Sequence, residues 1–360
     1  MNTAHSILVR TLACGLFVLF TVISTNAQFK AGIQGTVTDS TGGLVPEAQV
    51  TLTNSETGKS QTTTASNDGF YRFSSLPPGA YALSAEKTGF KKQVFENVVI
   101  NAEATQGIDI ILTAGEIAET VTVTETTTQG LETENANVSR AITTREIQQL
   151  PQTGRDPYEL LRLTPGIFGT GARAGGGQSL GFPNGPGNDP NVAGPGGSNT
   201  SIFQTENQVP ISANGQRVSN NNFTVDSVSV NSLGFGGAAV VTPNQESVKE
   251  VRVLSSSYSA EDGRNSGAQV KVVSQNGTNE FHGSAFFKYN DPGLNAFNKF
   301  GDFNGGPPTR VENRFRQFGG SLGGPLYLPR FGEGGSSTVG GKNKTFFFFS
   351  FEALRNKTNN

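Results

Sequence analysis

The chain has 360 residues, of which 16% are charged, 46 are glycine, 17 are proline and 26 are phenylalanine, while tryptophan is absent. Its formal net charge of -2 argues against a nucleic-acid-binding protein, which normally carries a basic patch. The single cysteine, Cys14, excludes an intramolecular disulfide and every cysteine-based zinc cluster. Two histidines, His5 and His282, are too few for a multi-histidine metal site. Few charges with much Gly, Phe, Asn and Thr favour an exported, mainly β protein.

Residues 1–27 have the parts of a secretory signal peptide. Arg10 supplies the positive charge, residues 12–23 form an apolar run, and Thr25-Asn26-Ala27 offers small residues for cleavage. The apolar run is shorter than the roughly 20 residues that a membrane-spanning helix needs. Cys14 hints at a lipoprotein anchor, but most of the apolar run follows it, which favours a cysteine buried in the signal helix. We therefore expect export and removal of this segment.

Residues 31–114 contain short segments in which apolar and polar residues alternate. Turn signals separate the segments, among them Asn67-Asp68-Gly69 and Pro77-Pro78-Gly79. Short strands that recur every 8–12 residues or so indicate an antiparallel β-sandwich. We expect seven strands, at residues 32–39, 49–54, 60–65, 69–73, 80–85, 94–100 and 107–112.

Four motifs in this region resemble the carboxypeptidase regulatory-like, or transthyretin-like, β-sandwich. They are Gly35-Thr36-Val37-Thr38-Asp39, Pro46-x-Ala48-x-Val50, Asn67-Asp68-Gly69-x-Tyr71-x-Phe73 and Leu76-Pro77-Pro78-Gly79-x-Tyr81. The resemblance implies this fold but no peptidase activity, because the module accompanies many unrelated proteins. One histidine after the signal peptide also cannot supply the ligands of a catalytic zinc ion.

Residues 115–275 are expected to form an α+β domain. Helical stretches are predicted over 144–150 and 157–163, with Thr143 or Thr144 as the N-cap of the first. A tract rich in Gly, Pro and Asn follows from Gly169 to Ser198, and we interpret it as a mobile loop. The tract contains no phosphate-binding P-loop motif.

Motifs in this second region resemble the plug domain of TonB-dependent outer-membrane receptors. More narrowly, they are similar to the Oar-like branch, whose members carry a carboxypeptidase-like module before the plug. The motifs are Ile211–Arg217, Asn222–Asp226, Glu246–Val253 and Tyr258–Arg264, with Leu150-Pro151 and Leu163-Thr164-Pro165-Gly166 upstream. One departure is Ser227, which follows Asp226 where the family often has glycine.

Residues 277–360 are rich in Phe, Gly and Asn, and they contain three candidate membrane strands. The first places Phe281, Ala285, Phe287 and Tyr289 on one face, with His282, Ser284 and Lys288 on the other. This alternation over about ten residues is typical of a transmembrane β-strand. The other candidates are residues 314–323 and 345–354. The run Phe346–Phe349 does not alternate, so by itself it favours burial and not a lipid face.

These strands resemble the opening of an Oar-like barrel, and the resemblance implies about 22 strands in total. A closed outer-membrane barrel needs at least about eight strands, because unpaired edges in lipid leave backbone groups unsatisfied. Only three candidates occur before Asn360. We therefore expect the chain to be the N-terminal piece of a longer receptor.

One β-prone segment stands between the sandwich and the expected plug. The resemblance implies that it is a TonB box, which adds as a strand to a sheet edge of the periplasmic energy transducer. Alternating Val and Thr without proline suit such an exposed strand. Two alternatives remain, namely the first plug strand or a linker from the sandwich. The segment consists of Glu119, Thr120, Val121, Thr122, Val123 and Thr124.

No catalytic, cofactor-binding or metal-binding residue is predicted. His282 is better explained as a residue facing the barrel lumen than as a member of a Ser-His-Asp triad. Glu261 and Asp262 near Arg264 are better explained as a solvated turn with a local ion pair than as an acid/base pair. No calcium-loop motif occurs in the sequence.

The favoured interpretation is the N-terminal portion of a TonB-dependent outer-membrane receptor, with its N-terminal domains in the periplasm. It implies energised uptake of an unknown extracellular ligand, plug gating, and two partners, a TonB-type transducer and outer-membrane lipid. The alternative is an exported adhesin or glycan- or protein-binding protein that transports nothing. The DNA beyond codon 360 and heat-modifiable mobility on a gel would separate the two.

Overall fold

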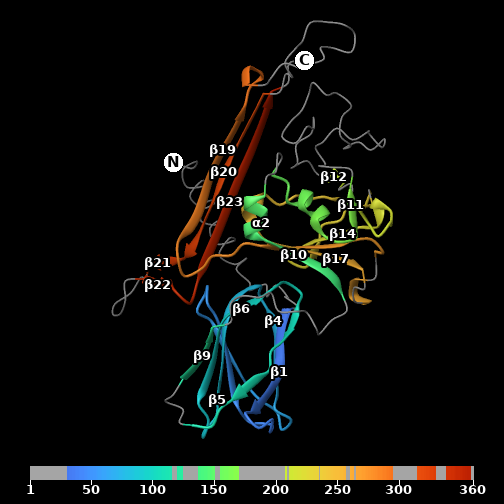
Figure 1. Ribbon diagram of the computed structural model, residues 1–360. Coiled ribbons are helices and arrows are strands. Elements are labelled where there is room, and N and C mark those ends of the chain that lie inside the picture. The colour runs from blue at the N-terminus through green and yellow to red at the C-terminus, as the bar shows by residue number, and fades with distance from the viewer. Residues whose placement is uncertain are drawn as a thin grey trace, which may run out of the picture.

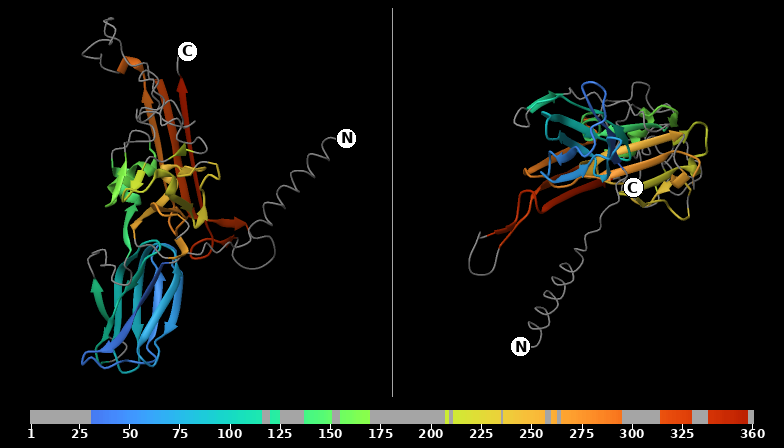
Figure 2. Two further views of the ribbon diagram at one scale, coloured as in Figure 1. Left: turned by 90° about the vertical axis from the view of Figure 1, so that its right-hand side faces the viewer. Right: turned by 90° about the horizontal axis from the view of Figure 1, so that it is seen from below.

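The protein has three parts: a β-sandwich at one end, a middle unit next to it, and a sheet of long strands along one side of the middle unit (Figures 1 and 2). The computed structural model describes residues 31–115, 120–124, 137–150, 155–169, 207–208, 211–234, 236–256, 260–262, 265–294, 314–329 and 338–357. The predicted signal peptide, Glu119 and residues 170–198 of the predicted loop lie outside the described residues. The fold is mainly β, as the sequence predicts.

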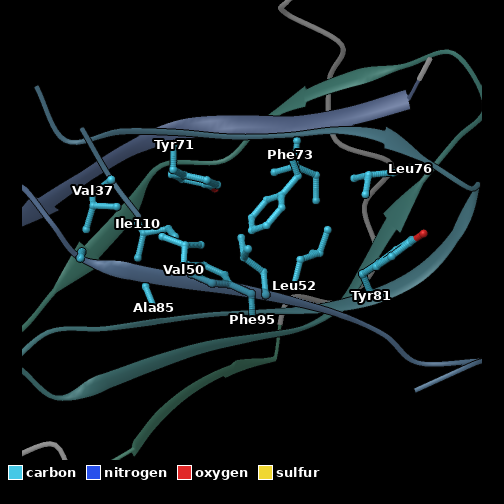
Figure 3. Packing of buried hydrophobic residues seen from close by; sticks show 14 of the residues in the cluster. Val37, Val50, Leu52, Tyr71, Phe73, Leu76, Tyr81, Ala85, Phe95 and Ile110 are labelled. Carbon is cyan, nitrogen blue, oxygen red and sulfur yellow. The ribbon is translucent and has the colours of Figure 1, made fainter. Parts of the chain in front are cut away.

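The N-terminal part is a sandwich whose two sheets enclose one core (Figure 3). One sheet has the strand order β3-β2-β5-β6-β9, and β1 lies between β4 and β7/β8 in the other. Val50 and Leu52 of β2 face Tyr71 and Phe73 of β4 across the core, because alternate residues of a strand point to one side. The strands are β1 (Ala31–Asp39), β2 (Gln49–Asn54), β3 (Ser60–Thr64), β4 (Phe70–Leu76), β5 (Gly79–Glu86), β6 (Lys92–Ile100), β7 (Thr105–Gly107), β8 (Ile110–Leu112) and β9 (Thr120–Thr124).

The last predicted strand of the sandwich, residues 107–112, is divided into β7 and β8, which both pair in parallel with β1. The division lies at Ile108 and Asp109. The carboxylate of Asp109 accepts hydrogen bonds from the backbone N–H and the hydroxyl of Thr36, at 2.8 and 2.7 Å. The carbonyl of Ile108 approaches Gly35 so closely that a Cβ atom there would lie 1.8 Å from it. A regular strand cannot make both contacts.

The middle unit is built on a five-stranded sheet of order β10-β17-β18-β14-β15. Its apolar side chains and those of the short helical segments form a second core around Tyr158, Phe223 and Val251. The sheet strands are β10 (Val138–Thr143), β14 (Asn222–Val225), β15 (Val228–Ser229), β17 (Val248–Ser256) and β18 (Gln269–Ser274). Two small ribbons pair β11 (Ile167–Gly169) with β13 (Ile211–Ala213) and β12 (Asn207–Gln208) with β16 (Ala238–Ala239).

The helical segments of the middle unit are short. The α-helix α2 (Thr144–Gln149) begins with a capping box, in which Thr143 and Glu146 each bind the other's backbone N–H. The second predicted helix is the 3-10 helix η1 (Pro157–Leu163), capped by Asp156. The remaining 3-10 turns are η2 (Val218–Asn220), η3 (Gln245–Ser247), η4 (Ala260–Asp262) and η5 (Pro292–Leu294). No helix among the described residues is long and apolar enough to cross a membrane.

Ser227 takes a backbone conformation that glycine adopts more easily. Asp226 and Ser227 join β14 to β15 with φ angles of 47° and 67°. Positive φ at both central residues defines the tight turn that suits the twist of a two-residue hairpin. The turn that glycine would favour therefore forms here with serine.

The third part is an open antiparallel sheet of three long strands, β19 (His282–Asn290), β20 (Arg314–Pro325) and β23 (Phe346–Lys357). Phe281 and Phe287 are exposed on its outer face, as their alternation predicts. The four-phenylalanine run also alternates. Phe349 is 65% exposed, whereas Phe348 stacks on His282. The strand pairing separates residues that the sequence run alone suggested were buried together.

Candidate functional site

Residues Thr120–Thr124 of the segment predicted to be a TonB box form β9, an edge strand of the sandwich. It pairs in parallel with β6, from Lys92 opposite Thr120 to Glu96 opposite Thr124. β9 and β3 are the two outermost strands of their sheet, and the Thr122 side chain is exposed. One alternative was that this segment forms the first strand of the plug. The structure instead pairs β9 with β6 of the sandwich.

An edge strand carries one row of backbone N–H and C=O groups that its own sheet does not use. Such a row is what another strand needs in order to add to the sheet. The extended conformation of β9 follows from its sequence, because Val and Thr favour extended backbone and the segment contains no proline. Chemically, β9 can therefore bind an extended polypeptide through its backbone.

A second feature is a buried charge cluster between the middle unit and the inner face of the long-stranded sheet. Arg155 of the middle unit donates to the carboxylate of Glu246 at 2.7 Å, and its Nε lies 3.6 Å from a carboxylate oxygen of Glu352 on β23. The Glu352 side chain is only 1% exposed. Buried charges are stable only when they are paired, so one guanidinium holds two carboxylates from different parts of the fold.

Residues from β19 and β20 complete this cluster. The guanidinium carbon of Arg155 lies 3.6 Å from the ring centre of Phe286, close enough for a cation–π interaction. Ser284 donates a hydrogen bond to Glu246, and Gln317 donates one to Glu352 at 2.6 Å. β19 and β23 thus contact the charges of the middle unit directly, while Gln317 of β20 binds Glu352 within the sheet.

Sequence reasoning found only part of this cluster. The alternation predicts Ser284 and Lys288 on the polar face of the first long strand, and Glu246 begins the motif Glu246–Val253. Arg155 and Glu352 were not singled out. The available signal was the alternation Ser350, Phe351, Glu352 after the phenylalanine run, which places two polar residues on one face of this strand.

The sandwich is fastened to the middle unit by polar contacts at two loops. In the loop after β6, the backbone N–H of Ala102 contacts both carboxylate oxygens of Glu250 at 3.0 Å. Glu103 of the same loop pairs with Lys271 at 2.7 Å. In the turn after β2, Glu56 pairs with Lys249 at 2.6 Å. These contacts set the position of β9 relative to the middle unit.

The residues considered for catalysis make ordinary structural contacts. His282 Nδ1 lies 3.0 Å from the carbonyl oxygen of Glu280 and 3.3 Å from the hydroxyl of Thr278. Asp262 pairs with Lys271 at 3.0 Å. Across the described residues, no three His, Cys, Asp or Glu side chains gather into a group that could hold a metal ion.

Two protein-family models match the chain. The carboxypeptidase regulatory-like domain matches residues 32–113, and an outer membrane beta barrel domain matches residues 273–360. Among curated proteins, the TonB-dependent transporter Oar of Myxococcus xanthus is 27% identical over 312 residues, which are 84% of this chain and 24% of Oar. The chain thus spans about a quarter of the length of this relative.

Solved structures align over parts of the chain. The siderophore receptor PirA from Acinetobacter baumannii covers 52% of this chain and 22% of its own, with 20% identity and a TM-score of 0.33. A putative carbohydrate binding protein from Bacteroides uniformis covers 22% of this chain and 40% of its own, with 23% identity and a TM-score of 0.20. Scores this low transfer neither fold nor ligand to this chain.

The two matched domains and the similarity to Oar agree with the motifs read from the sequence. The order of the domains is also the one that the Oar-like branch predicts, with the regulatory-like module first and the barrel strands last. Outer-membrane localisation follows from the barrel domain and from the similarity to a TonB-dependent transporter. The chain therefore carries a carboxypeptidase regulatory-like domain and an outer membrane beta barrel domain, and over most of its length it is similar to the TonB-dependent transporter Oar.

Proposed function

We propose that this chain is the N-terminal, gating portion of a receptor for energised uptake of an extracellular ligand. Residues 31–114 are then a periplasmic accessory domain, residues 115–275 the plug, and residues 277–360 the first barrel strands. The segment 119–124 is the TonB box, through which a TonB-type transducer pulls on the plug. In this proposal the chain acts in transport and not in catalysis.

The observation that carries this proposal is the position of β9. It is an exposed edge strand, and it lies in the chain between the sandwich and the middle unit, where a pull would act on both. Strand addition needs only backbone groups and an accessible edge. The free side of β9 offers that edge while its other side pairs with β6.

The buried charge cluster supports gating. Arg155 holds Glu246 and Glu352 together, so the middle unit is bound to the inner face of the barrel strands by charge pairs. Such pairs are stable while dry and weaken when water enters, because solvent screens the charges. A pull that admits water between plug and wall would release this contact.

The test is to disrupt β9 and measure binding of the periplasmic domain of a TonB-type transducer. We expect Thr122→Pro with Val123→Pro to reduce cross-linking to that domain at least tenfold, because neighbouring residues of a strand direct their N–H groups to opposite sides. The matched control is Thr62→Pro with Thr63→Pro in β3, the opposite edge of the same sheet. Equal cross-linking of both variants would refute the assignment of β9.

A further inference from the structure

A two-stranded hairpin leaves the long-stranded sheet at the end that lies beside the sandwich (Figure 1). It consists of β21 (Tyr327–Pro329) and β22 (Thr338–Gly340), which connect β20 to β23. Seen from below, the hairpin projects away from both the middle unit and the sandwich (Figure 2). Turns at the periplasmic end of outer-membrane barrels are usually short, so a projecting hairpin here calls for an explanation.

Backbone hydrogen bonds and one close ring contact fix the direction in which the hairpin leaves the sheet. Leu326 donates a backbone hydrogen bond to Thr345 and accepts one from Gly341, both at 2.8 Å. The ring of Tyr327 lies over Gly341, where a Cβ atom would be 2.3 Å from the ring and φ is +86°. Only glycine allows both this backbone conformation and this close approach. The hairpin therefore extends the β20–β23 ladder in a defined direction.

The hairpin exposes apolar side chains. Tyr327 is 46% exposed and Leu328 is 49% exposed, and Pro329 is exposed as well. A two-stranded hairpin by itself is at best marginally stable in water. Its persistence as a projecting element is explained if something apolar covers these residues.

The surface that continues into the hairpin is the lipid-facing side of the barrel strands. Phe281 lies over Gly324, one residue before the end of β20, and packs against Phe347 at 6.3 Å between ring centres. Phe281 is 65% exposed on this side. Tyr327 and Leu328 follow this end of β20 within four residues of Gly324, so the exposed apolar residues of the hairpin begin next to the lipid-facing surface.

The charged residues at the same place fit a phospholipid surface. Lys342 and Lys344 are exposed in the turn between β22 and β23. Tyrosine is enriched where a membrane meets water, and lysine side chains reach from apolar surfaces toward headgroups. Each lysine near an anionic leaflet contributes about 1 kcal/mol of attraction.

We propose that the β21–β22 hairpin is a membrane-interface arm, which lays Tyr327 and Leu328 among the phospholipid headgroups of the leaflet on the sandwich side. The arm would fix the depth and tilt of the first barrel strands. Its occupant is lipid because its apolar residues continue a lipid-facing surface and its lysines complement anionic headgroups. The proposal rests on the outer-membrane location and not on β9 or gating.

The test places one fluorescent label on the arm of the receptor reconstituted in bilayers of phosphatidylethanolamine with a minority of phosphatidylglycerol. Leu328→Cys carries an environment-sensitive nitrobenzoxadiazole label, because the one cysteine of this sequence, Cys14, lies in the expected signal peptide. The matched control is Leu44→Cys. Leu44 is 53% exposed, which is close to the 49% of Leu328, but it lies at the far end of the sandwich. Phe349→Cys on the lipid-facing side is the positive control.

We expect lipids that carry a nitroxide near the headgroup to quench the label at 328 several-fold more strongly than the label at 44. Aqueous iodide should show the reverse order. Equal quenching at 328 and 44 by both agents would overturn the proposal. A label at 328 that is shielded from iodide but not quenched by lipid would also overturn it, because a protein partner or second copy would then cover the arm.

Discussion

The backbone N–H of Ala102 lies 3.0 Å from both carboxylate oxygens of Glu250, and this contact joins the sandwich to the middle unit. Glu250 is 5% exposed, and Ala102 is 2% exposed. A buried carboxylate needs partners for its charge, and a buried N–H needs an acceptor. Each group therefore meets a requirement of the other across the domain boundary.

Removing that carboxylate should loosen the sandwich. We expect Glu250→Ala to cost about 1–3 kcal/mol, because the N–H of Ala102 would stay buried without its acceptor. Limited proteolysis between the sandwich and the middle unit should become faster. The matched control is Glu96→Ala, which removes an exposed carboxylate from β6 and should leave the cleavage rate unchanged. Identical rates for the two variants would contradict a docking role for Glu250.

Arg155→Ala should destabilise the contact between the middle unit and the barrel strands. Breaking a buried pair leaves uncompensated charge at a cost of roughly 3–5 kcal/mol, and here two carboxylates lose one partner. Arg140→Ala is the control, because its pair with Glu146 is about one-third exposed, with side-chain values of 37% and 32%. Exposed pairs contribute at most about 1 kcal/mol. Thermal unfolding should separate the variants, and equal shifts would contradict the burial argument.

Two glycines of the sandwich allow the stability cost of a steric clash to be compared with the cost of a strained backbone conformation. Gly35→Ala should cost about 3 kcal/mol or more, because its Cβ would lie 1.8 Å from the carbonyl oxygen of Ile108. Gly42→Ala meets no atom within 4 Å but has φ at +86°, so strain of about 1–2 kcal/mol is its main cost. Denaturant unfolding measures both. A larger loss for Gly42→Ala would show that the β7–β8 break relaxes easily.

The capping box of α2 should make the free energy of unfolding depend on pH. Burial raises the pKa of Glu146, but hydrogen bonds from Thr143 and the charge of Arg140 outweigh it, so the pKa lies below its usual value of 4.5. A lowered folded-state pKa contributes stability above the unfolded value, and this is lost as the pH falls through the folded value.

The matching variant is Glu146→Gln, which keeps a capping side chain and loses the charge. We expect it to cost about 0.5 kcal/mol at neutral pH, since a partly exposed pair is screened. The difference from the unchanged chain should shrink as the pH falls below 4.5 and vanish once the pH is below the lowered pKa of Glu146 in the folded protein. Urea unfolding at a series of pH values measures this difference in the free energy of unfolding. A difference that grows as the pH falls would contradict a lowered pKa for Glu146.

The sequence by itself determined the local and periodic features of this protein. Alternation at residues such as Val50, Leu52, Phe281 and Phe287 specified strands and their buried or lipid-facing sides, because a strand turns every second side chain to one face. Thr143 and Glu146 specified the start of α2, because a capping box is completed within four residues. Ordered motifs also indicated the resemblance to a carboxypeptidase regulatory-like domain followed by an outer-membrane receptor.

Tertiary structure decided which distant residues meet. Arg155 reaches Glu352 although their positions differ by 197 (352 − 155), and nothing local in either segment marks the pair. β9 joins the sandwich and not the middle sheet because strand partners are chosen by free edges and packing. The division of β7 from β8 likewise depends on how closely Ile108 approaches Gly35. Such contacts bring together separate parts of the chain, so only the folded arrangement reveals them.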